Sequence, residues 1–395
     1  MAKKTTNNAK PPAAASLVEE GGLVENPPVS RRRRSKGDPF FDLLRGPFHR
    51  LESSEVRRLF DKVDQGRVDK LAGLLSDYIG LNLPIAIERR EGLADYKINP
   101  YVLLTCANIM KLENGNLFAS FLFNTKLYSG LETSFGKSIE STVVGGYPLH
   151  PATAYKWADP PEKVEEFATY EGLSREDKAK MRTASVWREV DKSCVVGERR
   201  YMTSIKSGPN CINDSQVQAM TRAILDNHKH WMAATKKRYR NIKGLDIAIG
   251  ITYGTDRSTN NKENQILVKL IGQGFVEEDR EKKPGVLIDE ATRTIRVYRK
   301  IGKDFWGMIG NPVEPEKSQF TFLEVLMALT KALALVVKNA DIQTKVNVRI
   351  KALIHGLERL MFPRQVMPDW AANGLTEMHL FWFATAMSAF YDEGV

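Results

Sequence analysis

The sequence is poor in cysteine and lacks a long uncharged apolar run. Its three cysteines, Cys106, Cys194 and Cys211, form no close pair, which argues against a disulfide framework or a zinc site and favours a reducing compartment. The polar N-terminus has no apolar core of a signal peptide. The most apolar stretch, FTFLEVLMALTKALALVV, is interrupted by Glu324 and Lys331, so we expect a buried helix rather than a membrane span. We therefore expect a cytoplasmic protein that does not contact membranes.

Acidic residues are outnumbered, with 48 Asp and Glu against 58 Lys and Arg, and the formal net charge is +10. Such an excess favours an anionic partner such as nucleic acid. Residues 1–42 combine Pro, Ala, Asn, Lys and Arg with few aromatics, and a segment of this composition cannot bury enough apolar surface to offset its ordering entropy. We expect a disordered basic tail, in which RRRR is either a phosphate contact or a solubilising group.

Two helical regions are expected on either side of a mixed core. Apolar residues three and four apart in VDKLAGLLSDYIGL, NPYVLLTCANIM and LFASFLFNTKLYSGLE predict helices within a region spanning residues 43–125. LPIAIERR is interpreted as a short extended piece. TSFGKSIESTVVGG predicts a further helix that carries Glu140. Residues 316–395 return to a helical pattern.

Between them, residues 126–315 combine strands and helices. SCVV and RRYMTSIK flank a Gly-Glu turn and predict a β-hairpin. LDIAIGITYG is typical of a strand buried on both faces, and VLIDEATRTIRVYRKIG predicts a second hairpin. DSQVQAMTRAILDNHKHWM is an amphipathic helix with Asp214 or Ser215 as its N-cap. We expect an α/β fold with a mixed central sheet flanked by helices.

Three residues in this core suggest hydrolytic chemistry on phosphodiesters. Asp191 opens the first hairpin and Lys206 closes it, so both reach the open end, and the helix carrying Glu140 could pack across the same sheet. Carboxylate oxygens suit a hard cation such as Mg²⁺, which activates a bound water, and a lysine can stabilise charge on the phosphate. The spacing alone is a weak signal and favours an exposed salt bridge on a hairpin over a catalytic site.

The sequence DKSCVVGERRYMTSIKSGPNCINDSQ, residues 191–216, resembles the active-site core of type II restriction endonucleases of the PD-(D/E)XK nuclease superfamily. SIKSGPNCINDSQ carries most of the resemblance, and ETSFGKSIES and KIGKDFWGMIGNP support it. The resemblance implies a restriction-endonuclease-like sheet with helical N- and C-terminal additions. It also makes residues 126–315 the nuclease core.

Carried over by resemblance, Asp191 is the metal-binding aspartate, Lys206 the motif lysine and Glu140 the helix glutamate. Ser204 stands where the superfamily often has Asp or Glu, two residues before the lysine. Some restriction enzymes have Ser or Thr there and take the missing carboxylate from a helix. The resemblance therefore makes Glu140 the leading candidate for the second metal carboxylate beside Asp191, and Ser204 a member of the catalytic set.

Polar and basic residues near the motif are candidate DNA contacts. KKRYRNIK interleaves basic residues with Tyr239 and suits phosphate contacts, although a solvated helix end has the same composition. TDRSTNNK could read base edges or form a plain solvated loop, and Gln216 could simply begin a helix. The candidates are Ser207, Asn210, Asn213, Gln216, Lys236, Lys237, Arg238, Arg257, Asn260, Asn261 and Lys262.

The sequence thus favours a Mg²⁺-dependent, site-specific endonuclease that cleaves both strands of duplex DNA as a homodimer, since palindromic sites are read by two-fold dimers. Two alternatives remain open. One is a structure- or end-specific nuclease of the same superfamily. The other is a DNA-binding protein without catalysis, an alternative that the Ser204 departure keeps open.

Overall fold

The computed structural model describes residue 57 and residues 60–90, 92–146, 156–279, 281, 283–338, 340–359 and 367–390. The chain divides into two units, residues 1–59 and 60–395. Apart from residue 57, every described residue belongs to the second unit. The predicted tail, residues 1–42 with its RRRR sequence, lies outside the described residues.

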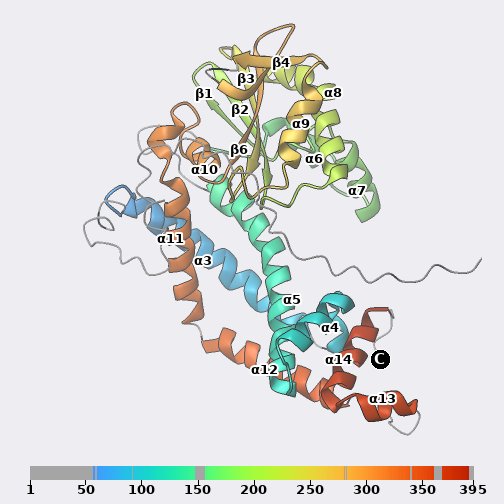
Figure 1. The fold of residues 1–395 in the computed structure, drawn as a ribbon. Helices are drawn as coiled ribbons and strands as arrows, with labels where there is room; N and C mark the ends of the chain where they lie inside the picture. Colours follow the sequence, from blue (N-terminus) through green and yellow to red (C-terminus); the bar gives the residue numbers. More distant parts are fainter. Residues whose placement is uncertain are drawn as a thin grey trace, which may run out of the picture. The chain divides into compact units, whose positions relative to one another are not determined.

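A six-stranded mixed sheet forms the centre of the molecule, in the order β1-β2-β3-β6-β5-β4 (Figure 1). Strand β2 pairs in parallel with β3, and β3 with β6, whereas the β1–β2, β5–β6 and β4–β5 pairs are antiparallel. The predicted α/β fold with a mixed sheet is confirmed. The strands are β1 (Lys192–Val196), β2 (Arg199–Lys206), β3 (Gly244–Ile251), β4 (Phe275–Asp279), β5 (Lys283–Asp289) and β6 (Ile295–Ile301).

Helices cover both faces of the sheet, which explains why every residue of β3 is buried. Helices α8 (Asp214–Arg238) and α9 (Lys262–Leu270) pack on one face, where Met202, Ile249 and Trp231 share a core. Helix α10 (Lys303–Gly310) lies on the other face, where Phe305 packs with Ile205 in a second core (Figure 1). Strands β2 and β3 are therefore buried except at the two ends of β2.

The helical N-terminal region is confirmed, with one correction. LPIAIERR was expected to be extended, but helix α3 continues through it to Glu88 with Pro84 inside. The buried face that begins at Val68 continues to Ile87, so packing outweighs the lost hydrogen bond of the proline. The elements before the sheet are α3 (Gln65–Glu88), η1 (Leu93–Tyr96), α4 (Pro100–Ile109), α5 (Gly115–Ser138), η2 (Ile139–Val144), α6 (Pro161–Ala168) and α7 (Arg175–Ala184).

Helix α5 joins two segments that the sequence predicts as separate helices. It runs without a break from Gly115 to Ser138 and passes directly into η2, a π-helical segment that contains Glu140. The expected boundary between residues 125 and 126 thus lies inside a helix. Helix α5 and η2 together form one continuous helical segment that connects the helical N-terminal region to the sheet.

The C-terminal region is helical, as predicted. Helix α11 packs along α3, and Glu324, which interrupts its apolar run, is buried and accepts two hydrogen bonds from the Arg67 guanidinium, at 3.1 and 2.8 Å. The stretch Pro315–Val337 is long and apolar enough to cross a membrane by length and composition, a test that core helices also pass. One face of α11 is buried, as expected, whereas Leu326 and Leu335 are exposed. The elements are η3 (Pro315–Ser318), α11 (Thr321–Val337), α12 (Ala340–Arg359), α13 (Asp369–Gly374), α14 (Glu377–Met387) and η5 (Ser388–Phe390).

Candidate active site

The open end of the β1–β2 hairpin holds two of the predicted residues. Asp191 immediately precedes β1, and its backbone N–H donates to the Thr203 carbonyl at 2.9 Å. Its carboxylate Oδ2 accepts a hydrogen bond from the Ile205 N–H at 2.7 Å. Lys206 is the last residue of β2. The hairpin register therefore brings Asp191 to the strand end that carries Lys206.

Glu140 approaches the same edge from η2. Burial raises the pKa of its carboxyl group, and the negative charge of Asp191 raises this pKa further. Lys192 and Lys163 partly oppose the effect, whereas Asp159 adds to it. A π-helical turn redirects side chains and often occurs at functional sites. The backbone around Glu140 is therefore consistent with a functional role for its carboxylate. Asp191 and Glu140 thus form an electrostatically coupled pair of carboxylates.

Two lysines that were not among the predicted site residues surround this pair. Lys163, on α6, donates to the Val190 carbonyl at 2.7 Å, and its Nζ lies 3.9 Å from Asp191 Oδ1. Lys192 is mostly buried and pairs with Asp159 at 2.6 Å. Lys192 adjoins the motif in sequence and so offered a signal, but nothing in the sequence links Lys163 to Asp191.

A third carboxylate, also missed, lies beside the motif lysine. Glu189 Oε2 is 3.9 Å from Lys206 Nζ. Ser204 is buried, and its Oγ has no hydrogen-bond partner among the described residues. Ser204 and Lys206 are two residues apart on β2 and therefore face the same side of the sheet. The available signal was the spacing of Glu189 and Asp191, two residues apart just before a strand.

Two glycines let the neighbouring elements approach this edge closely. A Cβ at Gly136 on α5 would lie 3.1 Å from Ser207 Cβ, and one at Gly208 would lie 2.5 Å from the Tyr253 hydroxyl. Both glycines belong to segments of the predicted resemblance, FGKSIE and IKSGP. Their lack of a side chain allows α5 and the residues after β3 to pack against the turn after Lys206.

The turn after Lys206 leads directly into α8, and its polar residues have different surroundings. Asn213, rather than Asp214 or Ser215, is the N-cap, and with Gln216 it forms a reciprocal capping box. Both side chains thus satisfy backbone groups at the helix start, the simpler of the roles considered for Gln216. Ser207 Oγ lies 3.2 Å from Cys211 Sγ, and Asn210 is exposed.

Residues 252–262 lie against this turn. The Asn260 N–H donates to the Pro209 carbonyl at 3.3 Å, and its side-chain amide donates to the Ile212 carbonyl at 2.9 Å. Lys262 pairs with Asp214, and Asn261 precedes α9 in a left-handed conformation. The Arg257 side chain is exposed. The structure thus gathers the candidates from 207–216 and 257–262 at one edge of the sheet.

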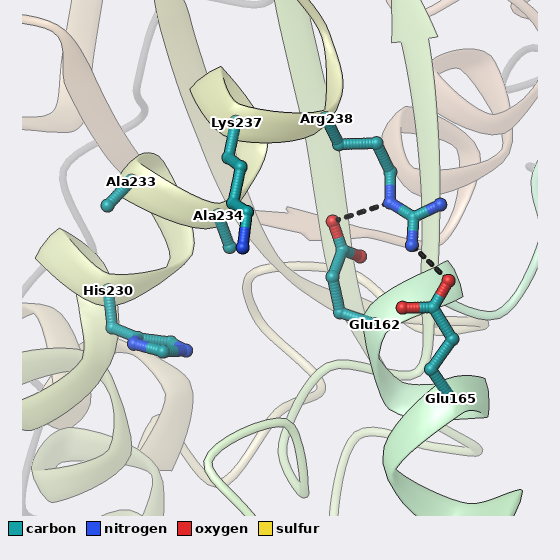
Figure 2. Close-up of a pocket in the computed structure, with 7 residues that line it drawn as sticks. All are labelled: Glu162, Glu165, His230, Ala233, Ala234, Lys237 and Arg238. Atoms are coloured by element: carbon teal, nitrogen blue, oxygen red, sulfur yellow. Dashed lines mark hydrogen bonds and ion pairs between the residues drawn. The ribbon is translucent and has the colours of Figure 1, made fainter.

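The remaining candidates, Lys236, Lys237 and Arg238, lie at the other end of α8. At 1.5 Å per residue, α8 places Lys236 about 30 Å from Gln216. A hollow of about 620 Å³ lies there, lined by residues of α6 and α8. Figure 2 shows its lining residues. Arg238 is exposed, and its side chain pairs with Glu162 at 3.3 Å and with Glu165. The structure does not bring this cluster to Lys206, and its contact with phosphate stays a prediction.

The carboxylate pair fits a divalent cation. Mg²⁺ keeps several waters and uses one or two protein carboxylates together with substrate phosphate. The described part of the chain contains no group of three or more His, Cys, Asp or Glu side chains poised to hold a metal. Asp191 and Glu140 nevertheless meet the requirement for two protein carboxylates. Their repulsion, which raises the pKa of Glu140 and which Lys163 and Lys192 only partly oppose, is one that a bound cation would relieve.

Comparison with known proteins identifies a family match in the central part of the chain. The family model of type II restriction endonuclease EcoO109I matches residues 172–283. No curated protein matches the chain. The matched segment contains Asp191, Ser204 and Lys206, whereas Glu140 lies outside it. Over its hairpin, the following turn and α8, the chain is similar to type II restriction endonucleases, which confirms the resemblance predicted from DKSCVVGERRYMTSIKSGPNCINDSQ.

Proposed function

We propose that this chain is a Mg²⁺-dependent endonuclease that cleaves both strands of duplex DNA at a specific sequence. The observation that supports the proposal is the placement of Asp191 and Lys206 at the open end of one hairpin, with the charge of Glu140 acting on that of Asp191. The hairpin lies within the segment that matches a restriction endonuclease. The net charge of +10 supports a polyanionic substrate.

Each residue has a distinct role in the proposed reaction. Asp191 and Glu140 would hold Mg²⁺, which when bound supplies an activated water and polarises the phosphate. The Ile205 N–H fixes the Asp191 carboxylate through Oδ2, and Oδ1, which lies 3.9 Å from Lys163 Nζ, is the oxygen that would bind the cation. Lys206 stabilises negative charge on the phosphate as it develops. Exposed polar groups at 207–216 and 257–262 lie where the DNA backbone would pass.

A homodimer belongs to the same proposal. One chain carries one set of Asp191, Glu140 and Lys206, so cleavage of both strands in one binding event requires two copies. A two-fold arrangement would present the two sites to the two antiparallel strands in equivalent ways.

Lys206→Ala tests this proposal against a matched lysine. Lys243 lies beside the other end of the same hairpin and pairs with Glu198 at the surface. We expect purified wild type and Lys243→Ala to cut plasmid DNA into discrete fragments with Mg²⁺. Lys206→Ala should be slower by about 100-fold or more.

The other outcomes are equally informative. A smear instead of bands would favour a nuclease without sequence specificity. Equal rates for Lys206→Ala and Lys243→Ala would remove Lys206 from the mechanism. Retained DNA binding with no cleavage by any of the proteins would favour a DNA-binding protein without catalysis.

A further inference from the structure

Glu189 is placed beside Lys206 by an element other than β2. It ends the turn that precedes Val190 and Asp191, and its Oε2 lies 3.9 Å from Lys206 Nζ. Its other oxygen lies 3.9 Å from Arg188 Nε. The Glu189 and Lys206 side chains are only 21% and 18% exposed, so solvent and salt screen their attraction less than that of a surface pair.

Strand β2 provides no acidic side chain at this point. Ser204 lies two residues before Lys206 on the same face, and its buried Oγ lacks a hydrogen-bond partner among the described residues. Ser204 and Glu189 line the same small enclosed hollow together with Met202, Met220 and Trp231. Glu189 thus lies where it can reach the neighbourhood of Ser204, the position at which this chain departs from the acidic motif.

The three acidic residues at the edge divide into two sets. Glu140 is coupled to Asp191 and reaches it from η2. Glu189 instead faces Lys206, which projects to the α8 side of β2 together with Ser204, whereas Ile205 belongs to the opposite core. This division suggests that Asp191 and Glu140 bind the metal, whereas Glu189 acts through Lys206.

We propose that Glu189 is the positioning residue of Lys206 and takes over, from the turn before β1, the place beside the lysine that Ser204 leaves without a carboxylate. The proposal rests on the proposed nuclease function for its consequence in catalysis. Its structural content, the pairing of Glu189 with Lys206, does not depend on that function.

Cleavage kinetics test the catalytic consequence. In full-length protein, we expect Glu189→Gln to lower kcat by about 10- to 100-fold, the range typical of residues that orient an active-site group, with KM for DNA unchanged. Glu189→Asp keeps the charge and should recover most of the rate. Glu198→Gln, which removes an exposed carboxylate from the same hairpin, should leave kcat unchanged.

A second measurement tests the pairing of Glu189 with Lys206 independently of DNA cleavage. The rate at which an amine-selective reagent modifies Lys206, followed by mass spectrometry, should rise at least threefold in Glu189→Gln and stay unchanged in Glu198→Gln. If Glu189→Gln changes neither kcat nor the modification rate, the inference is wrong although the nuclease proposal stands.

Two further outcomes separate the proposals. If wild type does not cleave DNA, the nuclease proposal fails, and the modification rate alone decides whether Glu189 holds Lys206. If Glu189→Gln weakens Mg²⁺ binding by the same factor as Glu140→Gln, Glu189 is a metal ligand and the positioning role is overturned.

Discussion

At the scale of single residues, the Glu140 carboxylate lowers the stability of the folded chain but is needed for the proposed activity. Its pKa is raised above the ordinary value of 4.5 by burial and by Asp191, against the opposing effect of Lys192 and Lys163. Folding therefore disfavours its ionised form, and at neutral pH this charge lowers the stability of the folded state. We predict that Glu140→Gln raises Tm at pH 7.5 but lowers cleavage by at least about 100-fold.

The pH dependence of this effect has a defined sign. Because the pKa of Glu140 is higher in the folded chain, the stability advantage of Glu140→Gln should be largest above that pKa and vanish as pH falls below 4.5. Mg²⁺ should raise the Tm of wild type but not of the variant. Glu132→Gln, on the exposed side of α5, is the control. A lower Tm for Glu140→Gln at pH 7.5 would contradict the prediction.

The sequence predicts some of these residues and misses others for physical reasons. Asp191 and Lys206 could be placed because the length of a hairpin fixes which residues meet at its open end. The capping role of Asn213 follows from the Asn-x-x-Gln pattern and was missed in favour of its neighbours. The spacing of Glu189 and Asp191 was a signal that the prediction left unused, whereas Lys163 reaches Asp191 from a separate helix through a side-chain contact that no spacing rule predicts.

At the scale of elements, one buried cation connects α6 to the sheet and α8. The Arg200 side chain is fully buried on β2 and donates two hydrogen bonds to Glu162 on α6, at 2.9 and 2.8 Å, and one to Thr235 on α8 at 3.1 Å. Its guanidinium also lies over the rings of Trp187 and Tyr239. Helix α6 carries Lys163, so this connection also holds a cation beside Asp191.

Removal of the Glu162 charge should therefore strongly destabilise the folded protein. We predict that Glu162→Gln lowers the free energy of unfolding by about 3–5 kcal/mol, because it leaves a buried guanidinium uncompensated. Glu165→Gln, on the same helix but exposed and paired with the exposed Arg238, should cost less than about 1 kcal/mol. Urea denaturation of both variants tests this difference, and equal losses would show that the Arg200 contact contributes little.

Element prediction failed where tertiary packing outweighs local preference. Residues 83–90 look extended because Pro84 and alternating apolar residues interrupt the helical pattern, yet the buried face of α3 continues through them. Strand β4 was missed because FVEED is mostly polar and gains its strand structure from pairing with β5. The buried strand β3 was predictable, since a continuous apolar run needs no knowledge of its neighbours.

At the scale of the whole molecule, the sheet order determines which loops meet. Strands β2 and β3 are parallel neighbours, with Lys206 paired to Ile251, so the segments that come after them, 207–216 and 252–262, emerge at the same edge. The sequence shows both segments as polar, with Arg257 and Lys262 in the second, but it does not reveal the strand order that brings them together. It likewise does not reveal that α8 carries Lys236 and Lys237 to its far end.

This arrangement predicts which basic residues contact DNA. A duplex positioned with a phosphate at Lys206 passes the edge that carries Arg257, whereas Lys236 and Lys237 lie about 30 Å along α8 from Gln216. Each lost phosphate contact lowers the salt dependence of binding by about one unit of slope. Arg257→Ala should therefore weaken DNA binding and reduce the slope of log K against log[salt] by about 1.

The double variant Lys236→Ala/Lys237→Ala is the counterpart, because it removes more positive charge from the distant end of α8. We expect its slope to equal that of wild type in fluorescence anisotropy with a 20-base-pair duplex and Ca²⁺ in place of Mg²⁺. A smaller slope for the double variant together with no change for Arg257→Ala would mean that DNA binds along α6 and α8. Asp191, Glu140 and Lys206 would then lie away from the bound duplex, and the nuclease proposal would lose its geometric basis.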